Sequence, residues 1–208
     1  MRFLANGYWS PKEIALRLYG SVLISSSSPG IITGILSKLK AMGLIERIPL
    51  WKTRRARYYY RHRSCLASLL YWLDERFESE SYPLTKIENV LYDKLGIEVQ
   101  FFICELLAKS KGLKRAYSIL PSKIGDIDII LIDRKGRPIE GFEVKIGYIS
   151  KSEVRRLIDR IRSLGIPKVG LISLVEKPSQ LLGVDEILGP DELLMEARKL
   201  RSIEWSNL

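Results

Sequence analysis

The sequence has little of what a zinc site or a disulfide framework needs. Its 208 residues include two cysteines, Cys65 and Cys104, without a CxxC pair, and one histidine, His62. A structural zinc site takes four Cys or His ligands, and these three side chains cannot supply them. We therefore expect two reduced thiols without a role in the chemistry of the protein.

Long apolar runs are also missing. No stretch approaches the roughly 20 apolar residues that cross a bilayer, so we expect a cytoplasmic protein. Glutamine and asparagine are scarce beside abundant Lys, Arg and Glu, a balance typical of thermophilic proteins. With 46% apolar residues the chain can still bury a core in one large or two small domains.

The positive charge is confined to one part of the chain. The net charge is +10, and residues 1–63 carry 12 Lys and Arg against Glu13 and Glu46. Residues 64–208 carry 22 basic and 22 acidic side chains, so this part is neutral. Such asymmetry indicates a polyanionic partner for the first part of the chain alone.

Residues 1–63 show the order of a winged helix-turn-helix domain. Ser10 followed by Pro11 and Glu13 is a capping box at the start of a helix. Ser28-Pro29 opens a second helix, which Gly43 ends. Strands at 44–48 and 57–60 follow, with a basic loop between them at 49–56, so the 28–42 helix takes the recognition position and the loop forms the wing.

The wing is the stronger candidate for nucleic-acid binding. The exposed side of the recognition helix carries Thr33, Ser37 and Lys38, which favours contacts to phosphates over readout of bases. Trp51 and Tyr58 lie beside the cations of the wing, and a protein-docking role for this domain is the alternative. The candidate DNA-binding residues are Lys52, Arg54, Arg55, Arg57 and Lys38.

The rest of the chain is predicted to form a linking helix at 64–81 and an α/β domain at 82–208. The linking helix has an acidic end, and the boundary between the two lies near Tyr82-Pro83. Helices and strands alternate in a pattern that predicts one mixed central sheet. The expected elements are helical segments through Lys111, strands at 117–120, 126–133 and 139–146, a helix at 152–164 capped by Ser152, a strand at 169–174 and a helix at 191–201.

The hairpin at 125–145 holds the candidate catalytic residues. If Lys135-Gly136 forms a two-residue turn, Asp128 lies opposite Glu143. Strand alternation places both carboxylates and Lys145 on one face and apolar side chains on the other. Asp126, opposite Lys145, is expected to pair with that lysine or with Lys123. The alternative is a pair of exposed strands whose charges are solvated.

Two facing carboxylates on otherwise apolar strands destabilise the sheet unless a cation lies between them. Oxygen ligands at this spacing suit Mg²⁺ or Mn²⁺, which use one or two carboxylates and keep waters and a substrate phosphate. We expect Asp128 and Glu143 to bind this metal. Lys145 would orient or deprotonate the attacking water and stabilise charge on the phosphate.

The segments D-I-I-L at 128–131 and F-E-V-K at 142–145 resemble the motif of the PD-(D/E)XK nuclease superfamily. That resemblance implies a restriction-endonuclease-like fold in which Asp128 and Glu143 bind metal and Lys145 assists hydrolysis. The whole chain resembles the C-terminal region of a family of archaeal AAA-type ATPases, in which a winged helix precedes such a domain. No Walker A motif (GxxxxGK[ST]) occurs, so the ATPase domain is absent here.

One position departs from the motif. The helix before the hairpin, expected at 96–107, should carry a glutamate that completes the site, and Gln100 stands there, with Glu98 and Glu105 as the alternatives. The hypothesis is thus a DNA-binding, metal-dependent nuclease that hydrolyses phosphodiesters. Two alternatives stay open: a non-catalytic DNA-binding or regulatory module, and a docking module for an ATPase partner. The resemblance also raises a homodimer, since many nucleases of this fold dimerise.

Overall fold

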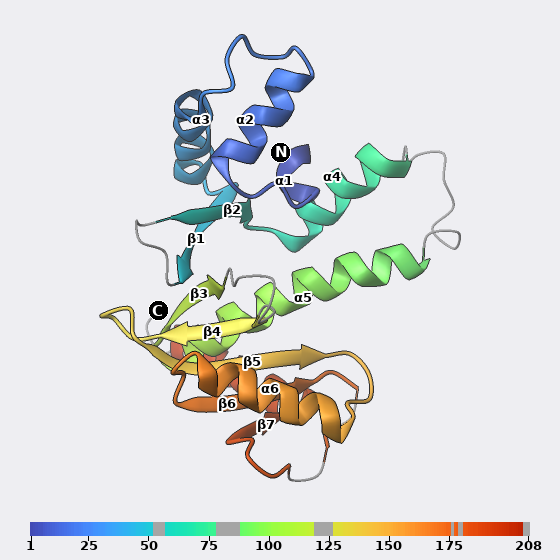
Figure 1. The fold of residues 1–208 in the computed structure, drawn as a ribbon, viewed down its shortest axis with the longest axis vertical. Helices are drawn as coiled ribbons and strands as arrows, with labels where there is room; N and C mark the ends of the chain where they lie inside the picture. The colour runs from blue at the N-terminus through green and yellow to red at the C-terminus, as the bar shows by residue number, and fades with distance from the viewer. Residues whose placement is uncertain (52–56, 78–87, 119–126, 176, 179–180, 206–208) are drawn as a thin grey trace. The chain divides into compact units, whose positions relative to one another are not determined.

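The computed structural model describes residues 1–51, 57–77, 88–118, 127–175, 177–178 and 181–205 (Figure 1). Within these ranges the chain is a mixed α/β protein with seven helices and two sheets. It forms two compact units, Met1–Leu95 and Gly96–Leu208, which divide inside helix α5 (Glu88–Ser110). The boundary predicted at Tyr82-Pro83 lies outside the described residues. None of the described helices is long and apolar enough to cross a membrane.

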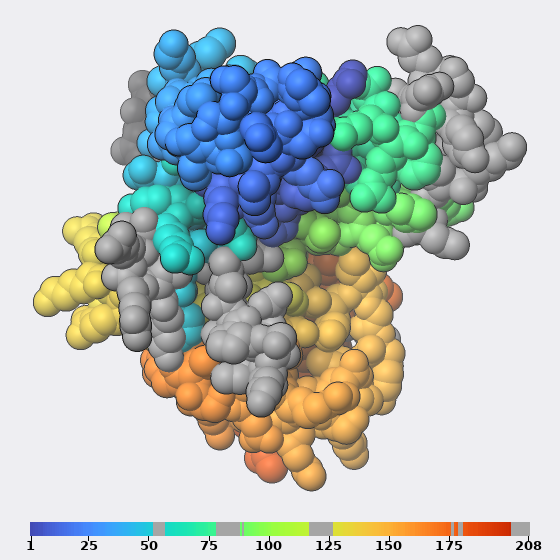
Figure 2. Space-filling view, turned by 45° about the horizontal axis from the view of Figure 1, so that its top comes forward, coloured from blue at the N-terminus to red at the C-terminus, as the bar shows by residue number. Residues whose placement is uncertain are grey.

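Three helices open the first unit: α1 (Arg2–Ala5), α2 (Pro11–Gly20) and α3 (Pro29–Ala41). The predicted capping box is confirmed, because the Ser10 hydroxyl accepts from the backbone N–H of Glu13 while the Glu13 carboxylate accepts from that of Ser10. Gly43 follows α3 with a φ of +74°, a conformation that glycine adopts without strain. The atoms of α2 and α3 lie together on the face drawn in blue in Figure 2.

The helices of this unit share one small core with the hairpin that follows. Its buried members come from the first three helices and from both strands of the hairpin, namely Leu4, Ile14, Ala15, Ile32, Leu36, Ile45 and Tyr60. Tyr19 and Ile35 stand at helical spacing from the other apolar residues of α2 and α3, yet they are 52% and 50% exposed. The apolar stripe of each helix is therefore narrower than its sequence suggests, because only one side of the helix packs on the core.

An antiparallel hairpin, β1 (Ile45–Trp51) and β2 (Tyr58–His62), completes the predicted order. The predicted loop at 49–56 begins too early, since β1 continues through Pro49, which pairs with Tyr58, to Trp51. Trp51 is 8% exposed and so cannot serve as a stacking surface beside the wing. Residues 52–56 lie outside the described residues.

Helix α4 (Cys65–Phe77) packs against α1, as polar contacts show. Arg2 forms an ion pair with Asp74 at 2.6 Å, and Asn6 donates to Glu75 at 2.8 Å. Deeper in this unit, the Lys94 ammonium donates to the backbone oxygen of Ala5 at 2.9 Å. The described part of the helix that was predicted as a linker over 64–81 therefore packs within the first unit.

The second unit contains one mixed sheet, as predicted, and its five strands have the order β3-β4-β5-β6-β7. The first three strands pair antiparallel and the last three parallel. Their bounds are Lys114–Ser118, Ile129–Ile132, Pro138–Lys145, Lys168–Ser173 and Glu186–Leu188. The sequence gives no sign of β7, because three residues are too few to show alternation.

Helices cover both faces of this sheet (Figure 1). Helices α5 and α7 (Pro190–Trp205) pack on one face and α6 (Lys151–Ser163) on the other. The core between α5, α7 and the sheet includes Ile103, Leu107, Ile129, Leu131, Phe142, Ile172, Leu188 and Leu193. On the second face, Ile161 of α6 packs directly over Gly141 of β5.

The N-cap of α6 lies two residues before its predicted position. Ser150, rather than Ser152, is the N-cap, and its hydroxyl accepts from the backbone N–H of Glu153 at 3.3 Å. The Glu153 carboxylate accepts in turn from the backbone N–H of Ser150 at 2.9 Å. This reciprocal capping box satisfies donors at the helix end, so it holds α6 at a fixed starting point after β5.

The close approach of β5 and β6 gives a stability prediction. Phe142 pairs with Gly170, and a Cβ atom at Gly170 would lie 2.0 Å from the Phe142 ring. Because Phe142 is fully buried, its ring has no space to move into. We expect Gly170→Ala to lower the free energy of unfolding by about 3 kcal/mol or more, as overpacked cores do.

Urea unfolding measures this effect, and Gly141→Ala is the matched control on the neighbouring strand. A Cβ there meets Ile161 at 3.3 Å, so we expect a loss below about 1 kcal/mol. Equal free energies of unfolding for Gly170→Ala and Gly141→Ala would contradict the close packing of Phe142 on Gly170.

Candidate functional site

Strand β5 carries two of the predicted site residues on the face that α6 covers. Alternation along the strand points Phe142 and Val144 into the core under α5 and α7, and it points Glu143 and Lys145 to the other side. Glu143 is 9% exposed although it is ionisable. Its Oε1 lies 3.2 Å from the ammonium of Lys145, so the two residues form an ion pair.

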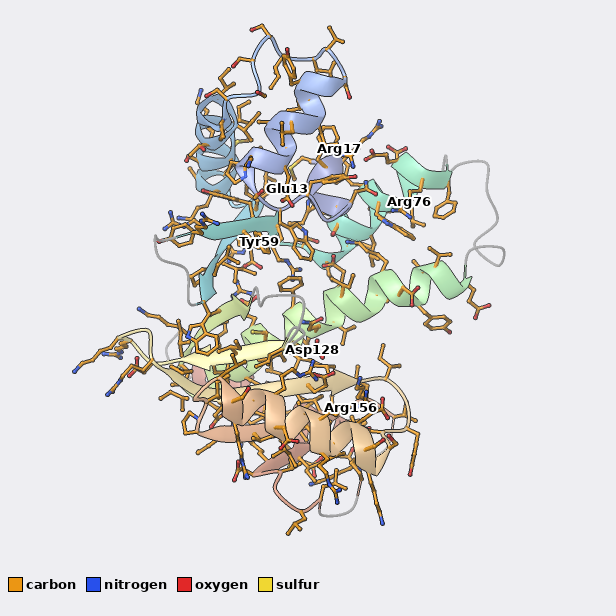
Figure 3. All side chains as sticks on the ribbon, in the orientation of Figure 1. Glu13, Arg17, Tyr59, Arg76, Asp128 and Arg156 are labelled. Atoms are coloured by element: carbon orange, nitrogen blue, oxygen red, sulfur yellow. The ribbon has the colours of Figure 1, made fainter. Side chains whose placement is uncertain are left out.

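The third predicted residue, Asp128, lies directly before β4 (Figure 3). Its Oδ2 accepts from the backbone N–H of Val144 at 2.8 Å, which fixes the carboxylate against β5. Asp128 also lies close enough to Glu143 for the two charges to repel, and Lys145 attracts it. The structure therefore brings together the three predicted residues, Asp128, Glu143 and Lys145, on one face.

The register of the hairpin is as predicted at the site, but its turn is not. The two-residue turn predicted at Lys135-Gly136 is wrong, because the Asp133 N–H donates to the Arg137 carbonyl and three residues connect them. A register irregularity between this turn and the site offsets the extra residue. Ile129 therefore pairs with Phe142, as the predicted register requires.

In the absence of a cation, the surroundings of Asp128 disfavour the negatively charged form of its carboxyl group. Burial of its carboxyl, and then the nearby charge of Glu143, raise its pKa from 3.8 to about 6. The Val144 N–H and the charges of Lys145 and Arg160 lower the pKa only in part. A pKa raised by burial next to a like charge is typical of carboxylates at functional sites.

Helix α5 presents Gln100 to the hairpin. The Gln100 amide donates to the backbone oxygen of Asp128 at 2.7 Å, so the predicted position of this side chain beside the site is confirmed. Glu105 instead forms ion pairs with Lys109 and Arg115. Glu98 precedes Gln100 by two residues, which on a helix is roughly the opposite side. A neutral amide therefore stands where the motif expects a carboxylate.

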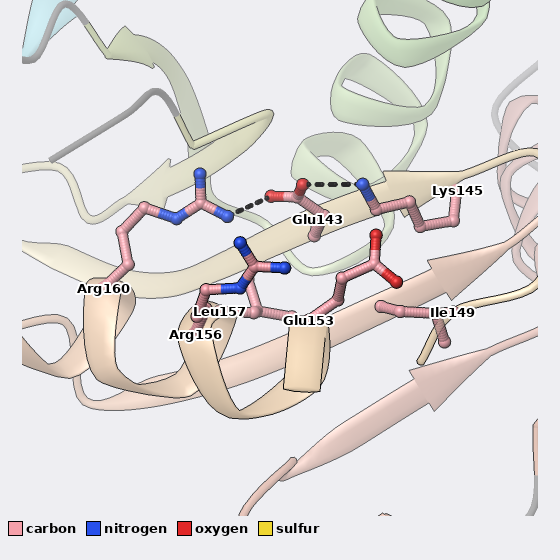
Figure 4. Close-up of a pocket in the computed structure, with 7 residues that line it drawn as sticks. All are labelled: Glu143, Lys145, Ile149, Glu153, Arg156, Leu157 and Arg160. Carbon is pink, nitrogen blue, oxygen red and sulfur yellow. Dashed lines mark hydrogen bonds and ion pairs between the residues drawn. The ribbon is translucent and has the colours of Figure 1, made fainter. Parts of the chain in front are cut away.

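Arg160 of α6 is the site residue that the sequence analysis missed. Its guanidinium lies 3.1 Å from Oε2 of Glu143, so Arg160 and Lys145 hold the two carboxylate oxygens from opposite sides (Figure 4). Arg156, one turn earlier, points toward the same pocket. In the sequence, the spacing of four residues between Arg156 and Arg160 on a strongly amphipathic helix could have indicated that both lie on one side of that helix.

Asp128 and Glu143 are the carboxylates that could bind a metal ion at this site. Among the described residues, no group of three or more His, Cys, Asp or Glu side chains could hold a metal ion. Asp128 and Glu143 supply two oxygen donors, which fits Mg²⁺ or Mn²⁺ bound with waters and a substrate phosphate. Asp126 and Lys123, considered as partners in this site, lie outside the described residues.

Only some of the nucleic-acid-binding residues predicted in the first unit lie within the described residues. Lys52, Arg54 and Arg55 lie outside the described residues, whereas Arg57 and Lys38 are exposed. On α3 the hydroxyls of Thr33 and Ser37 donate to the backbone oxygens of Pro29 and Thr33. These two side chains are thus engaged with their own helix, which agrees with the expectation of little base readout.

Comparison of the chain with models of known protein families, with curated proteins and with solved structures finds no match.

The raised pKa of Asp128 predicts how stability depends on pH in metal-free protein. Because the folded-state pKa lies above the ordinary value, the folded state holds the proton more tightly, and stability falls as pH rises from about 4 to about 6. Asp128→Asn removes the ionisable group and with it this loss of stability, and the amide oxygen can still accept from the Val144 N–H. We expect the variant to be more stable than the parent by roughly 2 kcal/mol at pH 7, with the difference vanishing near pH 4.

Urea unfolding across this pH range, with a metal chelator present, measures the difference. Asp133→Asn is the control in the same hairpin, because the Arg137 N–H and side chain lower the pKa of Asp133. Its stabilising effect is present at neutral pH and is lost as pH falls, so the control should change with the opposite sign. An Asp128→Asn variant less stable than the parent at pH 7 would mean that Lys145 and Arg160 fully satisfy the carboxylate.

Proposed function

We propose that the chain is a DNA-binding, divalent-metal-dependent nuclease that hydrolyses DNA phosphodiesters. The observation that carries this proposal is the meeting of Asp128, directly before β4, with Glu143 of β5, and Lys145 lies on the same face of β5 as Glu143. The mixed sheet covered on both faces by helices is consistent with a PD-(D/E)XK nuclease fold. In this proposal Asp128, Glu143 and Lys145 are catalytic, and the first two also bind the metal.

Each residue of this set has a distinct role in the proposed reaction. Asp128 and Glu143 would hold Mg²⁺ or Mn²⁺, which supplies Lewis-acid activation of the phosphate when bound. Asp128 is fixed by the Val144 N–H, and Glu143 by its place on β5, so both present oxygens without a large rearrangement. The Lys145 ammonium would orient the attacking water and stabilise the negative charge that grows on the phosphate oxygens.

DNA binding is proposed for the first unit, read as a winged helix-turn-helix domain. Its order of three helices and an antiparallel hairpin supports that reading. The charge of residues 1–63 supports phosphate contacts, with Lys52, Arg54, Arg55, Arg57 and Lys38 as the proposed binding residues.

Two observations favour a non-catalytic alternative, in which the second unit is a regulatory scaffold. Gln100 replaces the expected carboxylate, and its amide is engaged by the backbone of Asp128. Arg160 and Lys145 already neutralise Glu143. A third function, docking to a protein such as an ATPase, is favoured by exposed apolar side chains on α2 and α3, among them Leu16 at 51% and Ile31 at 48%.

A cleavage assay separates the enzyme from the scaffold. With Mg²⁺ or Mn²⁺ present we expect the protein to nick or cut DNA. Asp128→Ala, Glu143→Ala and Lys145→Ala should each lower the rate by about 100-fold or more, the loss usual when a group that stabilises transition-state charge is removed. Asp133→Ala, a carboxylate in the turn of the same hairpin, is the control that keeps full activity. Cleavage at the parent rate in Glu143→Ala would place the active site elsewhere.

The salt dependence of DNA binding tests the proposed role of the wing. Each wing cation that contacts a duplex phosphate releases roughly one counterion. Replacing Lys52, Arg54, Arg55 and Arg57 by Ala should therefore flatten the slope of log K against log salt by about 3 to 4 units.

The control for that measurement removes Arg198 and Lys199, two exposed cations of α7 in the second unit. We expect this pair of changes to leave the slope as it is in the parent. An unchanged slope in the wing variant would move the DNA site elsewhere and favour the docking alternative.

A further inference from the structure

Helix α6 turns two arginines toward the carboxylates of β5. Arg156 and Arg160 are four residues apart, so they lie on one side of the helix. They line a pocket of about 400 Å³ together with Glu143 and Lys145 of β5. Figure 4 shows both guanidinium groups extending from α6 toward Glu143. The pocket therefore gathers three cations around one strand.

Arg160 holds an oxygen that a metal ion would need. Its Nη2 lies 3.1 Å from Oε2 of Glu143, and Lys145 lies 3.2 Å from Oε1. A divalent cation at Glu143 would compete with these two groups for the carboxylate oxygens and would be repelled by their positive charges. Lys145 lies on the same strand as Glu143, whereas Arg160 reaches across from α6 on a long side chain. Arg160 is therefore the group that can leave.

Arg156 differs from Arg160 in its contacts. Among the residues that the structure describes, Arg156 makes no ion pair; hydrogen bonds from Ser150 are the main cause that lowers the pKa of Glu153, and the charges of Lys145 and Arg156 add to it. Glu153 is itself engaged by the N–H and hydroxyl of Ser150 in the capping box. A cationic side chain that points into a pocket without its own carboxylate partner is available to a ligand.

The charges of the pocket indicate which ligand would satisfy both arginines. Without metal, the cations Lys145, Arg156 and Arg160 face the carboxylates of Asp128, Glu143 and Glu153. A bound divalent cation adds two positive charges, and a DNA phosphodiester, which carries one negative charge, offsets part of that excess. Guanidinium groups bind phosphate oxygens through two parallel N–H donors, which makes arginine well suited to this ligand.

We propose that Arg156 and Arg160 form a phosphate-binding site in which Arg160 exchanges Glu143 for a DNA phosphate when the metal binds. The proposal rests on the proposed function, because it takes Asp128 and Glu143 as the metal ligands. In the free protein the ion pair between Arg160 and Glu143 weakens metal binding. In the complex the two arginines position the phosphate beside the metal, so substrate and metal bind cooperatively.

The first arm of the test measures Mn²⁺ binding without DNA, from the electron paramagnetic resonance signal of free Mn²⁺. Arg160→Gln removes the competing guanidinium, so its Kd for Mn²⁺ should be about tenfold lower than that of the parent, the change equal to one charged hydrogen bond. Arg156→Gln, one turn away, is the matched control and should stay within about threefold of the parent. Arg160→Lys keeps a charge near Glu143 and should also stay close to the parent.

The second arm uses thymidine 5′-monophosphate as a probe, with Mn²⁺ at saturation, and thymidine as the control that lacks the phosphate. Calorimetry should show binding of the nucleotide to the parent and a Kd about tenfold higher in Arg156→Gln and in Arg160→Gln. Arg160→Lys should bind the nucleotide more weakly than the parent, because an ammonium lacks the planar pair of donors. Thymidine should bind to none of the proteins.

The two arms separate this proposal from the proposed function. Equal Mn²⁺ affinities for Arg160→Gln and the parent would overturn the exchange of Arg160 between Glu143 and phosphate, even if the parent cleaves DNA. Equal nucleotide affinities across the variants would overturn the phosphate site. If Mn²⁺ binds neither the parent nor Arg160→Gln, the proposed metal site fails and the exchange of Arg160 fails with it. Nucleotide binding measured without Mn²⁺ then tests the anion site alone, and equal affinities of the parent and Arg156→Gln would overturn it.

Discussion

Two carboxylates meet at the centre of the second unit, Asp128 directly before β4 and Glu143 on β5. Asp128 is held by the Val144 N–H, and Glu143 lies between Lys145 and Arg160. Burial and mutual repulsion raise the pKa of Asp128 to about 6, so this arrangement is strained electrostatically without a further cation. Such a pair weakens a purely structural sheet, which is the physical reason for assigning it a function.

The surrounding fold keeps this pair in place. The parallel pairing of β5 with β6 sets Phe142 over Gly170, and the ring fills the space that a side chain would need. On the opposite face, the capping box of Ser150 and Glu153 starts α6 at a fixed point, from which Arg160 reaches Glu143. Rigid packing on one face and long, adjustable side chains on the other are compatible with the metal and phosphate binding that we propose for this site.

The sequence predicts the hairpin well, because alternation over two apolar strands fixes which side chains share a face. The positions of Asp128, Glu143 and Lys145 follow from it, although the turn was assigned one residue too short, whereas the position of Gln100 came from the resemblance to the nuclease motif. Arg160 could not be placed in the same way. Its contact with Glu143 depends on how the β5–α6–β6 crossover lays α6 on the sheet, and neither strand nor helix periodicity contains that information.

The most direct test of the metal site is a crystal structure of the protein grown with Mn²⁺, in which anomalous scattering locates the ion. We expect one Mn²⁺ bound by oxygens of both Asp128 and Glu143 at about 2.1 Å. The guanidinium of Arg160 should have left Glu143, and the ion should be absent from crystals of Asp128→Asn. An empty site at millimolar Mn²⁺, with Arg160 still paired to Glu143, would contradict the enzyme and favour the non-catalytic scaffold.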